Sequence, residues 1–431
     1  MKTLVFLIVI SGFCNLSLAS AEKALSIEQA VAQGLKSNLD ILAAKFGIPI
    51  ADADLMTAGL WANPALLIDT VFQPFGKNWD QTSAGGPREY DVVLSYPLDL
   101  SGKRSKAQKS AHEAVSIAKA TFEDQVRLKI LDIRLAYIDV MSQEYQYSLF
   151  QEKESTLKNL VSMTENRVGR NGHLPLLLMR AQLAWDQSKL DAKQREILLR
   201  AAMIQLSTLL GRNPNEKLLS VQTKLKDLKL MDLPEKENLI QIALETRSDL
   251  KALRFTLSKS DLDTELARAQ KWDNFSVTTG FSRQGPNDAN PNDSNSSVQG
   301  PGYSWSAGIL MPLPFFNGNQ GNIQKAQLIK SQTEKQLDSK TLSIRQEIEG
   351  LVDQLKLGRS LVEEYENKQL KRARSVLDAQ QKQFGTGNSA LLDYLDAVSA
   401  YQVTISSYYD SVSEYRRNIA RLSAAVGRDF E

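Results

Sequence analysis

The sequence predicts a mixed, mainly α-helical protein in which long helical hairpins accompany four short β-strands. Three observations support this fold class: a duplicated order of motifs, two pairs of long segments almost free of helix breakers, and four segments of alternating polarity. We expect each half of the chain to contribute one strand pair followed by one helical hairpin.

The two halves of the chain repeat the same motifs in the same order. Tyr96-Pro97-Leu98 is matched by Met311-Pro312-Leu313, and the segment Leu206–Arg212 is matched by Leu422–Arg428. The repeat unit is about half of the chain, far longer than the repeat of a solenoid. We therefore expect a duplicated molecule. The predicted structural repeats are residues 22–240 and 241–431.

Residues 1–21 have the features of a secretory signal peptide. Lys2 supplies a positive charge, an apolar stretch follows, and Ala19-Ser20-Ala21 is a suitable cleavage site. Cys14 raises the alternative of a lipid-anchored cysteine, but Phe13 stands where a lipoprotein site requires a small residue. Cleavage after Ala21 would leave a chain without cysteine, which excludes disulfides, thiol catalysis and thiolate metal sites.

The composition excludes some classes of partner. The chain has 52 basic and 50 acidic residues, a net charge of +2, and no basic block, so nothing indicates nucleic-acid binding. After the signal peptide, no apolar run approaches the roughly 18 residues that a membrane-spanning helix requires. If the chain enters a membrane, it must do so through strands.

Two long segments have the composition of continuous helices. Residues 103–168 contain no Gly or Pro, and residues 323–384 contain only Gly350 and Gly358 as interruptions. Each segment ends at a short turn with glycine, and a second segment without Gly or Pro follows. We therefore expect two long antiparallel helical hairpins. They span residues 103–210 and 322–426.

The second helix of each hairpin carries apolar residues at intervals of seven. Such strict spacing is typical of a coiled-coil seam rather than of the broader apolar stripe of a globular helix. By itself it also fits an ordinary intracellular coiled coil or a fibre. The seams comprise Leu176, Leu183, Leu190, Ile197 and Ile204 in the first half, and Leu391, Val398, Ile405, Val412, Ile419 and Val426 with Tyr394, Tyr401, Tyr408, Tyr415 and Leu422 in the second.

Four segments alternate in polarity with a period of two, as strands do. The first, residues 64–72, is the weakest because it is apolar on both faces at Leu66, Leu67 and Ile68. They form pairs near residues 64–98 and 274–312, and a long polar loop separates the members of each pair. The pattern fits transmembrane strands, apolar outside and small or polar inside, and also the half-buried strands of a soluble sandwich. The expected outward residues are Tyr90, Val92, Leu94 and Tyr96, then Phe275, Val277, Thr279 and Phe281, then Tyr303, Trp305, Ala307, Ile309 and Met311.

Four strands cannot form a membrane barrel alone. Backbone groups in lipid must all be hydrogen-bonded, so an open sheet edge is not tolerated there. About eight strands are the practical minimum for closure. The chain must therefore oligomerise if its strands span a membrane, and the sequence pattern does not fix the number of copies.

The order of elements and several motifs resemble the TolC family of outer-membrane efflux proteins. The corner Tyr96–Arg104 between a strand and a helix is most similar to the heavy-metal-efflux branch, the CzcC/CusC-type outer-membrane factors. The other motifs are Leu25-Ser26-Ile27-Glu28-Gln29-Ala30, Asn38, and the helix end Leu209-Leu210-Gly211.

The resemblance implies a homotrimer in the outer membrane of a Gram-negative bacterium. Four strands per chain would complete a 12-stranded β-barrel in lipid, and the helices would form a coiled-coil barrel that extends into the periplasm. The implied partners are a periplasmic adaptor (membrane fusion protein) and an inner-membrane pump of the RND type. Residues 213–233 would form an equatorial segment around the helical barrel.

The resemblance also implies a gate at the periplasmic end of the hairpins. The segment Leu392–Ala397 resembles the family segment that carries aspartate rings, here Asp393 and Asp396. These residues are three apart and share one helical face, and rings of carboxylates would favour cations. The alternative is a pair of solvated aspartates. Arg167 and Arg170 at the neighbouring tip are possible gate tethers.

Gly172 and Gly387 mark the turns at the two hairpin tips, where the resemblance implies that the adaptor docks. Glycines there also permit the left-handed conformations of a tight turn. Catalytic and metal sites find no support, because the only histidines, His112 and His173, lack a partner at ligand spacing. We expect no enzyme activity and no cofactor.

The expected function is that of a passive exit duct in a tripartite efflux system. It would conduct metal cations or small toxic compounds from the pump to the exterior. One alternative is the outer-membrane component of type I protein secretion. The other is a coiled-coil envelope protein without a pore.

Overall fold

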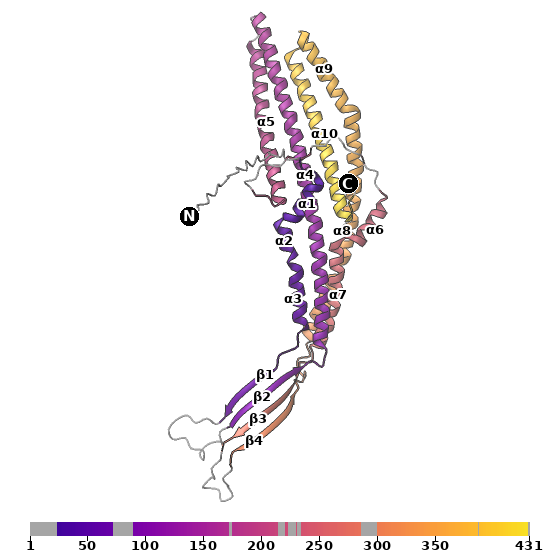
Figure 1. Cartoon of the computed structure of the whole chain (residues 1–431). Helices are drawn as coiled ribbons and strands as arrows, with labels where there is room; N and C mark the ends of the chain where they lie inside the picture. The colour runs from indigo at the N-terminus through magenta and orange to yellow at the C-terminus, as the bar shows by residue number, and fades with distance from the viewer. Residues whose placement is uncertain are drawn as a thin grey trace, which may run out of the picture. The chain divides into compact units, whose positions relative to one another are not determined.

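A computed structural model describes residues 24–71, 89–171, 175–213, 220–222, 230, 234–285, 300–386 and 388–429. The described part is mostly helical with one four-stranded sheet (Figure 1). The predicted signal peptide and most of the predicted equatorial segment fall outside the described residues. The elements are α1 (Ile27–Ser37), α2 (Leu39–Lys45), α3 (Gly47–Gly59), β1 (Ala65–Val71), β2 (Glu89–Leu98), α4 (Lys103–Asn171), α5 (Pro175–Leu209), α6 (Lys236–Thr246), α7 (Ser248–Ala269), β3 (Phe275–Gln284), β4 (Gly302–Leu310), α8 (Gln320–Glu364), the π-helix η1 (Tyr365–Gln369), α9 (Leu370–Thr386) and α10 (Leu391–Val426).

The chain forms two compact units, each assembled from three segments. Each unit combines residues from both predicted repeats, whose boundary at 240/241 stays a prediction. The helices α4, α8 and α10 contribute to both units. Unit 1 comprises Met1–Asn38, Ile130–Met231 and Leu355–Ala420, and unit 2 comprises Leu39–Lys129, Asp232–Gln354 and Arg421–Glu431.

Unit 2 contains the sheet, in which the strands follow the order β1-β2-β3-β4. All three neighbouring pairs are antiparallel. The central pair, β2 with β3, joins the two halves of the chain and places Val92 opposite Phe281. Within the described residues, β1 and β4 are the edges. The strand pairs predicted near 64–98 and 274–312 are confirmed.

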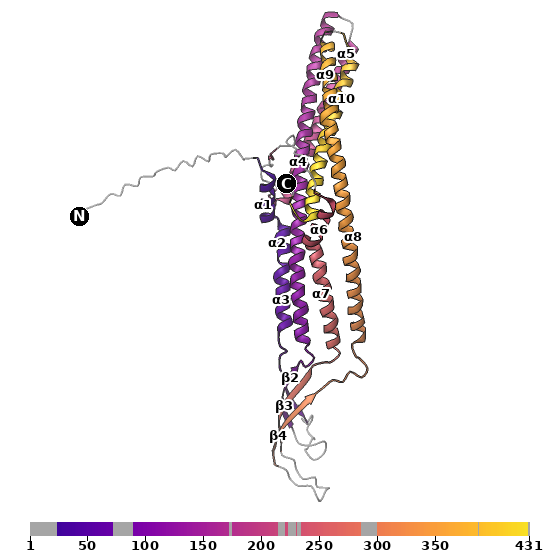
Figure 2. The same ribbon diagram turned by 90° about the vertical axis from the view of Figure 1, so that its right-hand side faces the viewer.

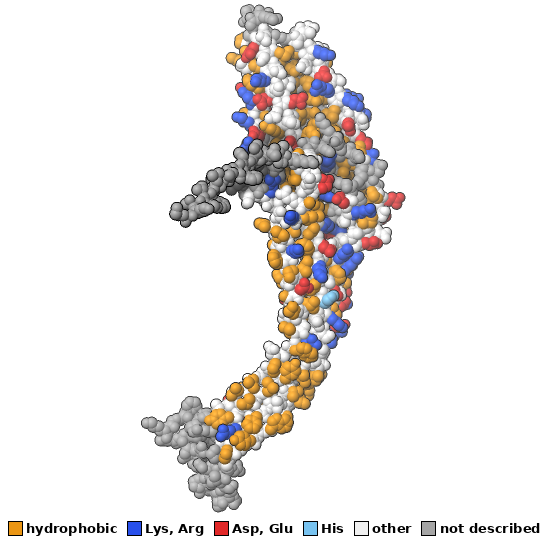
Figure 3. Space-filling model, viewed as in Figure 1, with side chains coloured by type: hydrophobic (Ala, Val, Ile, Leu, Met, Phe, Trp, Pro, Cys, Tyr) orange, Lys and Arg blue, Asp and Glu red, His pale blue; other side chains and the backbone are white. Residues whose placement is uncertain are grey.

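One face of the sheet is apolar and exposed. Because partners across a ladder point to the same face, the register aligns Ile68, Val92, Phe281 and Trp305 in one row over all four strands. All four side chains are exposed, Trp305 by 72%. Figure 3 shows apolar side chains covering much of the sheet. The predicted outward residues lie on this face, except Met311, which follows the end of β4.

The opposite face of the sheet carries mostly small and polar side chains, with Leu67, Val93 and Leu310 as apolar exceptions. Asp69, Asp91, Ser282 and Ser304 form one row across the four strands. Small size is required here, since a Cβ on Gly280 would lie 2.8 Å from Ser306 Oγ. The alternation therefore separates an apolar surface from a polar one, as the sequence predicts for strands in a membrane.

A short corner joins β2 to the first turn of α4. Asp99 Oδ1 accepts a hydrogen bond from the backbone N–H of Lys103 at 3.0 Å, and its Oδ2 accepts one from Arg104 N–H at 2.7 Å. Burial raises the pKa of Asp99, but these hydrogen bonds outweigh burial and hold it below the ordinary 3.8. Gly102 provides the left-handed residue of the corner, with φ of 71°. Beyond the corner, α3, α7, α8 and this end of α4 run side by side (Figure 2).

Unit 1 is built from the ends of the two hairpins, α4 with α5 and α9 with α10 (Figure 1). The seam predicted for α10 is largely buried, including Val398, Val412 and Tyr415. At the far end of this unit, Phe384 of α9 stacks on Tyr394 of α10 with ring centroids 5.5 Å apart. The cluster there also contains Leu157, Leu160, Val161, Ala181 and Leu391.

The seam predicted for α5 lies on a different face from its buried residues. Its five members are between 59% and 69% exposed. The buried residues of the helix are mostly small. They are Ala181, Ser188, Ala192, Leu199 and Leu206. The α5 stripe, defined as Leu176, Leu183, Leu190, Ile197 and Ile204, is therefore an apolar surface that the described residues leave exposed.

The glycines Gly350 and Gly358 do not interrupt the helix that contains them. Gly350 and Gly358 lie inside α8, and the α-helical pattern instead changes at the π-helix η1. Gly358 has a packing reason, because a Cβ there would lie 3.4 Å from Tyr415 Cδ2. Gly358 is thus a packing position, whereas a Cβ on Gly350 would meet no atom within 4 Å. The change of helix type follows both glycines by several residues.

Candidate functional site

The predicted gate residues lie on the exposed side of the first turns of α10. Asp393 and Asp396 are both exposed, whereas Leu391, Tyr394 and Val398 are buried in the hairpin core. The two carboxylates therefore share a face that no other part of the described chain covers. Asp393 is in the first turn of the helix, where a negative charge is also favourable to the helix dipole.

The other predicted tip residues are described only in part. Arg167 and Arg170 lie in the last turns of α4, but their side chains fall outside the described residues. Gly172 and Gly387 fall outside them as well. The gate tethers and the docking tips therefore stay predictions.

Carboxylates also line the polar face of the sheet. Asp69 lies directly opposite Asp91 on neighbouring strands. Glu89 is on the same face, where its Oε1 accepts hydrogen bonds from Ser282 Oγ at 2.5 Å and Gln284 Nε2 at 3.4 Å. A solute passing along this face would meet negative charge, which favours cations.

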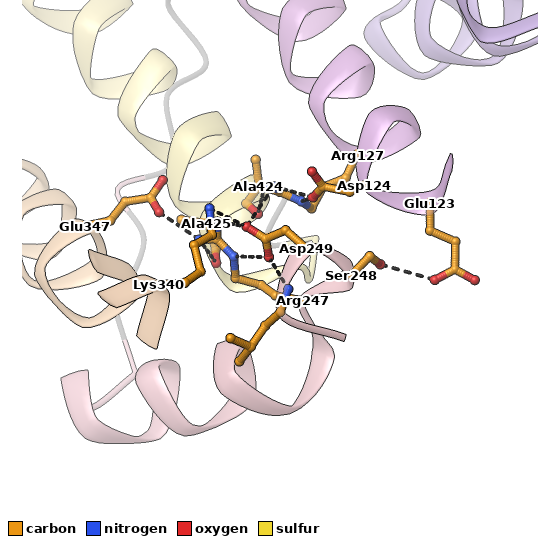
Figure 4. Close-up of polar contacts among 11 residues, drawn as sticks. Glu123, Asp124, Arg127, Arg247, Ser248, Asp249, Lys340, Glu347, Ala424 and Ala425 are labelled. Carbon is orange, nitrogen blue, oxygen red and sulfur yellow. Dashed lines mark hydrogen bonds and ion pairs between the residues drawn. The ribbon is translucent and has the colours of Figure 1, made fainter. Parts of the chain in front are cut away.

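A buried polar cluster fixes the C-terminal end of α10, and the sequence analysis did not assign it a role. Arg247, between α6 and α7, is only 4% exposed. Its Nε and Nη2 bond both carboxylate oxygens of Asp249, at 3.0 and 2.7 Å. Its Nη1 donates to Glu347 Oε2 at 2.7 Å and to the carbonyl of Ala425 at 3.1 Å (Figure 4). We call these residues, with Lys340, the α10 joint.

Each charged side chain of the joint has a partner of opposite charge. Lys340 Nζ lies 2.8 Å from Asp249 Oδ2. Burial raises the pKa of Asp249, but the hydrogen bonds from Arg247 and Lys340 reverse this and hold it well below the ordinary value of 3.8. Burial lowers the pKa of Arg247, yet its bonds to Asp249 and Glu347 raise it overall. A third cation, Arg127, donates to the carbonyl of Ala424 at 2.7 Å.

The helix α5, the second helix of the first hairpin, ends at a similar joint that uses a neutral side chain. Asn38 Nδ2 donates to the carbonyl of Leu209 at 2.8 Å, in the role that Arg247 has toward α10. Both helices end in a left-handed glycine, Gly211 with φ of 66° and Gly427 with φ of 73°. Gly211 admits no side chain, because a Cβ would lie 2.2 Å from the carbonyl oxygen of Ser37. The repeated helix-end motif marks the ends of both helices in the sequence, although not the side chains that bind them.

Neither metal ligation nor a helical membrane span is found in the described residues. No group of three or more His, Cys, Asp or Glu side chains there could hold a metal ion. Over the same residues, no helix combines the length and the hydropathy needed to cross a membrane.

Comparison with known families identifies the chain. The model of the family "Outer membrane efflux protein" matches residues 28–212 and 239–428, one segment in each half. The chain belongs to this family. It is accordingly an outer-membrane protein of the Gram-negative envelope that extends into the periplasm.

Its relatives in sequence are distant but aligned over most of their length. Nodulation protein T of Rhizobium leguminosarum bv. trifolii is 22% identical over 410 residues, covering 93% of this chain and 85% of the relative. The cobalt-zinc-cadmium resistance protein CzcC of Cupriavidus metallidurans is 22% identical over 376 residues, covering 86% and 83%.

Solved structures share the fold. CusC, described as forming a transmembrane channel, superposes with a TM-score of 0.75 at 20% identity and covers 93% of this chain and 92% of its own. The outer-membrane channel CmeC of Campylobacter jejuni superposes with a TM-score of 0.75 at 16% identity, covering 93% and 85%. The efflux protein therefore has the architecture of these channels.

Proposed function

We propose that this efflux protein is the exit duct of a tripartite efflux system and that it conducts solutes passively, without catalysis. The observation that carries the proposal is the sheet, which has one apolar face, one polar face and two edges within the described chain. Such a sheet suits a wall between lipid and water. Its edges must be paired before it can enter lipid, where each unsatisfied backbone group costs several kcal/mol.

Sister copies supply the missing pairing in this proposal. β4 of one copy pairs with β1 of the next, and three copies complete the 12-stranded barrel that the TolC resemblance implies. The α5 stripe supports the same assembly, because a strict heptad seam exposed along a whole helix is suited to a partner helix. The helices then form the periplasmic part of the duct.

The substrates that we favour are metal cations, with small toxic compounds second. Two observations support cations: the carboxylates Asp69, Glu89 and Asp91 on the polar face of the sheet, and the exposed pair Asp393 and Asp396. The name of the relative CzcC refers to cobalt, zinc and cadmium resistance. We propose that these carboxylates attract cations by charge alone, with no ligand cage.

In this proposal Asp393 and Asp396 form the gate of the duct, and Arg167 and Arg170 tether its closed state. The tips around Gly172 and Gly387 receive the periplasmic adaptor, which links the duct to an inner-membrane pump. Like charges crowded at a narrow mouth repel one another and exclude anions. The partners therefore drive opening, and the duct itself converts no energy.

Two measurements test the function. The processed protein, reconstituted in a planar bilayer, should give stable cation-preferring conductance, whereas a coiled-coil spacer without a pore would give none. A strain that lacks the gene should become more sensitive to cobalt, zinc and cadmium salts, and the gene supplied on a plasmid should restore resistance. Unchanged sensitivity to all three metals together with raised sensitivity to antibiotics would replace cations by small toxic compounds as the substrates.

A further inference from the structure

Every connection between the sheet and the helices of unit 2 exposes a large apolar side chain. The four connections join α3 to β1, β2 to α4, α7 to β3, and β4 to α8. Exposed apolar residues gathered in this way mark an interaction surface. In chain order they are Leu60 and Trp61, Leu100, Trp272, and Leu313, Phe315 and Phe316.

The connection from β4 to α8 presents the two most exposed of these side chains. Phe315 is 79% exposed and Phe316 97% exposed, so the described residues cover little of either ring. They come shortly after the outward residues Trp305 and Ile309, which are also exposed, the latter by 76%. The phenylalanine pair therefore continues the apolar face of the sheet beyond the end of its last strand.

Polar contacts, rather than the two rings, hold this connection in place. Asn319 adopts a left-handed φ of 59°, and its Nδ2 donates to the carbonyl of Ala267 in α7 at 2.7 Å. Its backbone N–H donates to Asn317 Oδ1 at 3.0 Å, and Gln320 Oε1 accepts from Gly318 N–H at 2.8 Å. Because the connection is fixed without the phenylalanines, their apolar surface is free for a partner.

Basic side chains accompany the aromatic rings at the same end of the sheet. The guanidinium carbon of Arg104 lies 3.9 Å from the centre of the Trp61 ring. Lys271 Nζ lies 5.9 Å from the centre of the Trp272 ring. Aromatic rings beside Lys and Arg are typical of the boundary between acyl chains and headgroups, where the ring meets apolar chains and the cation meets phosphate.

We infer that Phe315 and Phe316 insert into the periplasmic phospholipid leaflet of the outer membrane and anchor the base of the sheet there. Lipid is the occupant that fits, because the pair follows the apolar face of β4 in the chain and because Arg104 and Lys271 lie against aromatic rings in two other connections of the sheet. The inference rests on the proposed insertion of the sheet into the membrane. It adds a contact with lipid that is made by a loop outside the strands.

Spin labels at single cysteines test this placement. The only cysteine of the sequence, Cys14, lies in the predicted signal peptide, so the processed chain accepts Phe315→Cys or Phe316→Cys as its sole thiol. Each labelled protein is reconstituted in vesicles of phosphatidylethanolamine and phosphatidylglycerol. The accessibility of the label to oxygen, which concentrates in lipid, is compared with its accessibility to a water-soluble nickel chelate.

Two matched positions calibrate the readout. Ser339→Cys places a label on an exposed site of α8, and Ile309→Cys places one on the outward face of β4. Labels at 315 and 316 should be at least about threefold less accessible to nickel than the label at 339, as expected for insertion to the acyl boundary. Their accessibility to oxygen should approach that at 309.

Each other result overturns a stated claim. Nickel access at 316 equal to that at 339 would place the phenylalanines in water and refute the anchor. Low access to both reagents would show that a second copy covers them, which refutes it as well. If the label at 309 also lacks the oxygen preference, the sheet is not in lipid and the proposed function fails with the anchor.

Discussion

Replacing Arg247 by alanine tests the α10 joint, in which one buried guanidinium serves two carboxylates and a helix end. The substitution removes both hydrogen bonds to Asp249, the bond to Glu347 at 2.7 Å and the bond to the carbonyl of Ala425. Breaking a buried ion pair from one side costs about 3–5 kcal/mol. Because Lys340 remains 2.8 Å from Asp249, we expect the low end, about 3 kcal/mol.

The assay is urea unfolding of the detergent-solubilised protein, followed by the circular dichroism of its helices. The unfolding free energy of Arg247→Lys should fall between those of the wild type and Arg247→Ala, since lysine keeps the charge but cannot make the bidentate hydrogen bonds of arginine. Arg200→Ala is the matched control. Arg200 pairs with Glu196 at 2.7 Å on an exposed helix surface, so its loss should cost less than about 1 kcal/mol.

The contribution of the joint should depend on pH in a defined direction. The folded-state pKa of Asp249 lies well below its ordinary 3.8. The stabilisation is therefore fully present above the unfolded-state pKa, and it is lost as the pH falls below about 4 and approaches the folded-state pKa. The difference in unfolding free energy between wild type and Arg247→Ala should be constant from pH 5 to 7 and shrink below pH 4. An Arg247→Ala protein as stable as the Arg200→Ala control would refute this account of the joint.

Three further perturbations probe the gate, the seam and a buried phenol. Asp393→Ala with Asp396→Ala should raise conductance and weaken cation preference in planar bilayers; a match to the Ser399→Ala control, on the same exposed face, would remove the gate assignment. Leu190→Asp in the α5 stripe should convert the proposed trimer to a monomer in detergent, as measured by light scattering, and an unchanged trimer would show that this stripe is not a subunit interface. Burial raises the pKa of Tyr409 from 10.0 to about 12. Its contribution is therefore present below about pH 10 and lost toward pH 12, so Tyr409→Phe should retain more helix signal over that range than wild type.

The sheet could be predicted from the sequence because its information is local. Alternation with a period of two decides which side chains share a face, and Val92, Phe281 and Trp305 all lie on the predicted apolar face. The ends of α5 and α10 could also be predicted from the sequence, since Gly211 and Gly427 both adopt the left-handed conformation that ends a helix.

The partners of individual side chains were not readable from the sequence. A heptad pattern shows that α5 has a seam, but it does not say whether the same chain or a sister copy covers Leu183 or Leu190. The joint was missed because Arg247 and Glu347 are one hundred positions apart and meet only in the folded chain. The roles of the tip residues Arg170 and Gly387 stay predictions.

The central ladder of the sheet has a consequence for assembly. By pairing β2 with β3, it joins the strand pairs of the two halves of the chain, which as separate polypeptides would have to meet by diffusion. Within the described residues, each chain therefore has two unpaired strand edges, those of β1 and β4, instead of the four that two separate strand pairs would have. In the proposed assembly, fewer encounters between chains are needed to complete the barrel. A partly assembled intermediate also exposes fewer unpaired strand edges to incorrect partners.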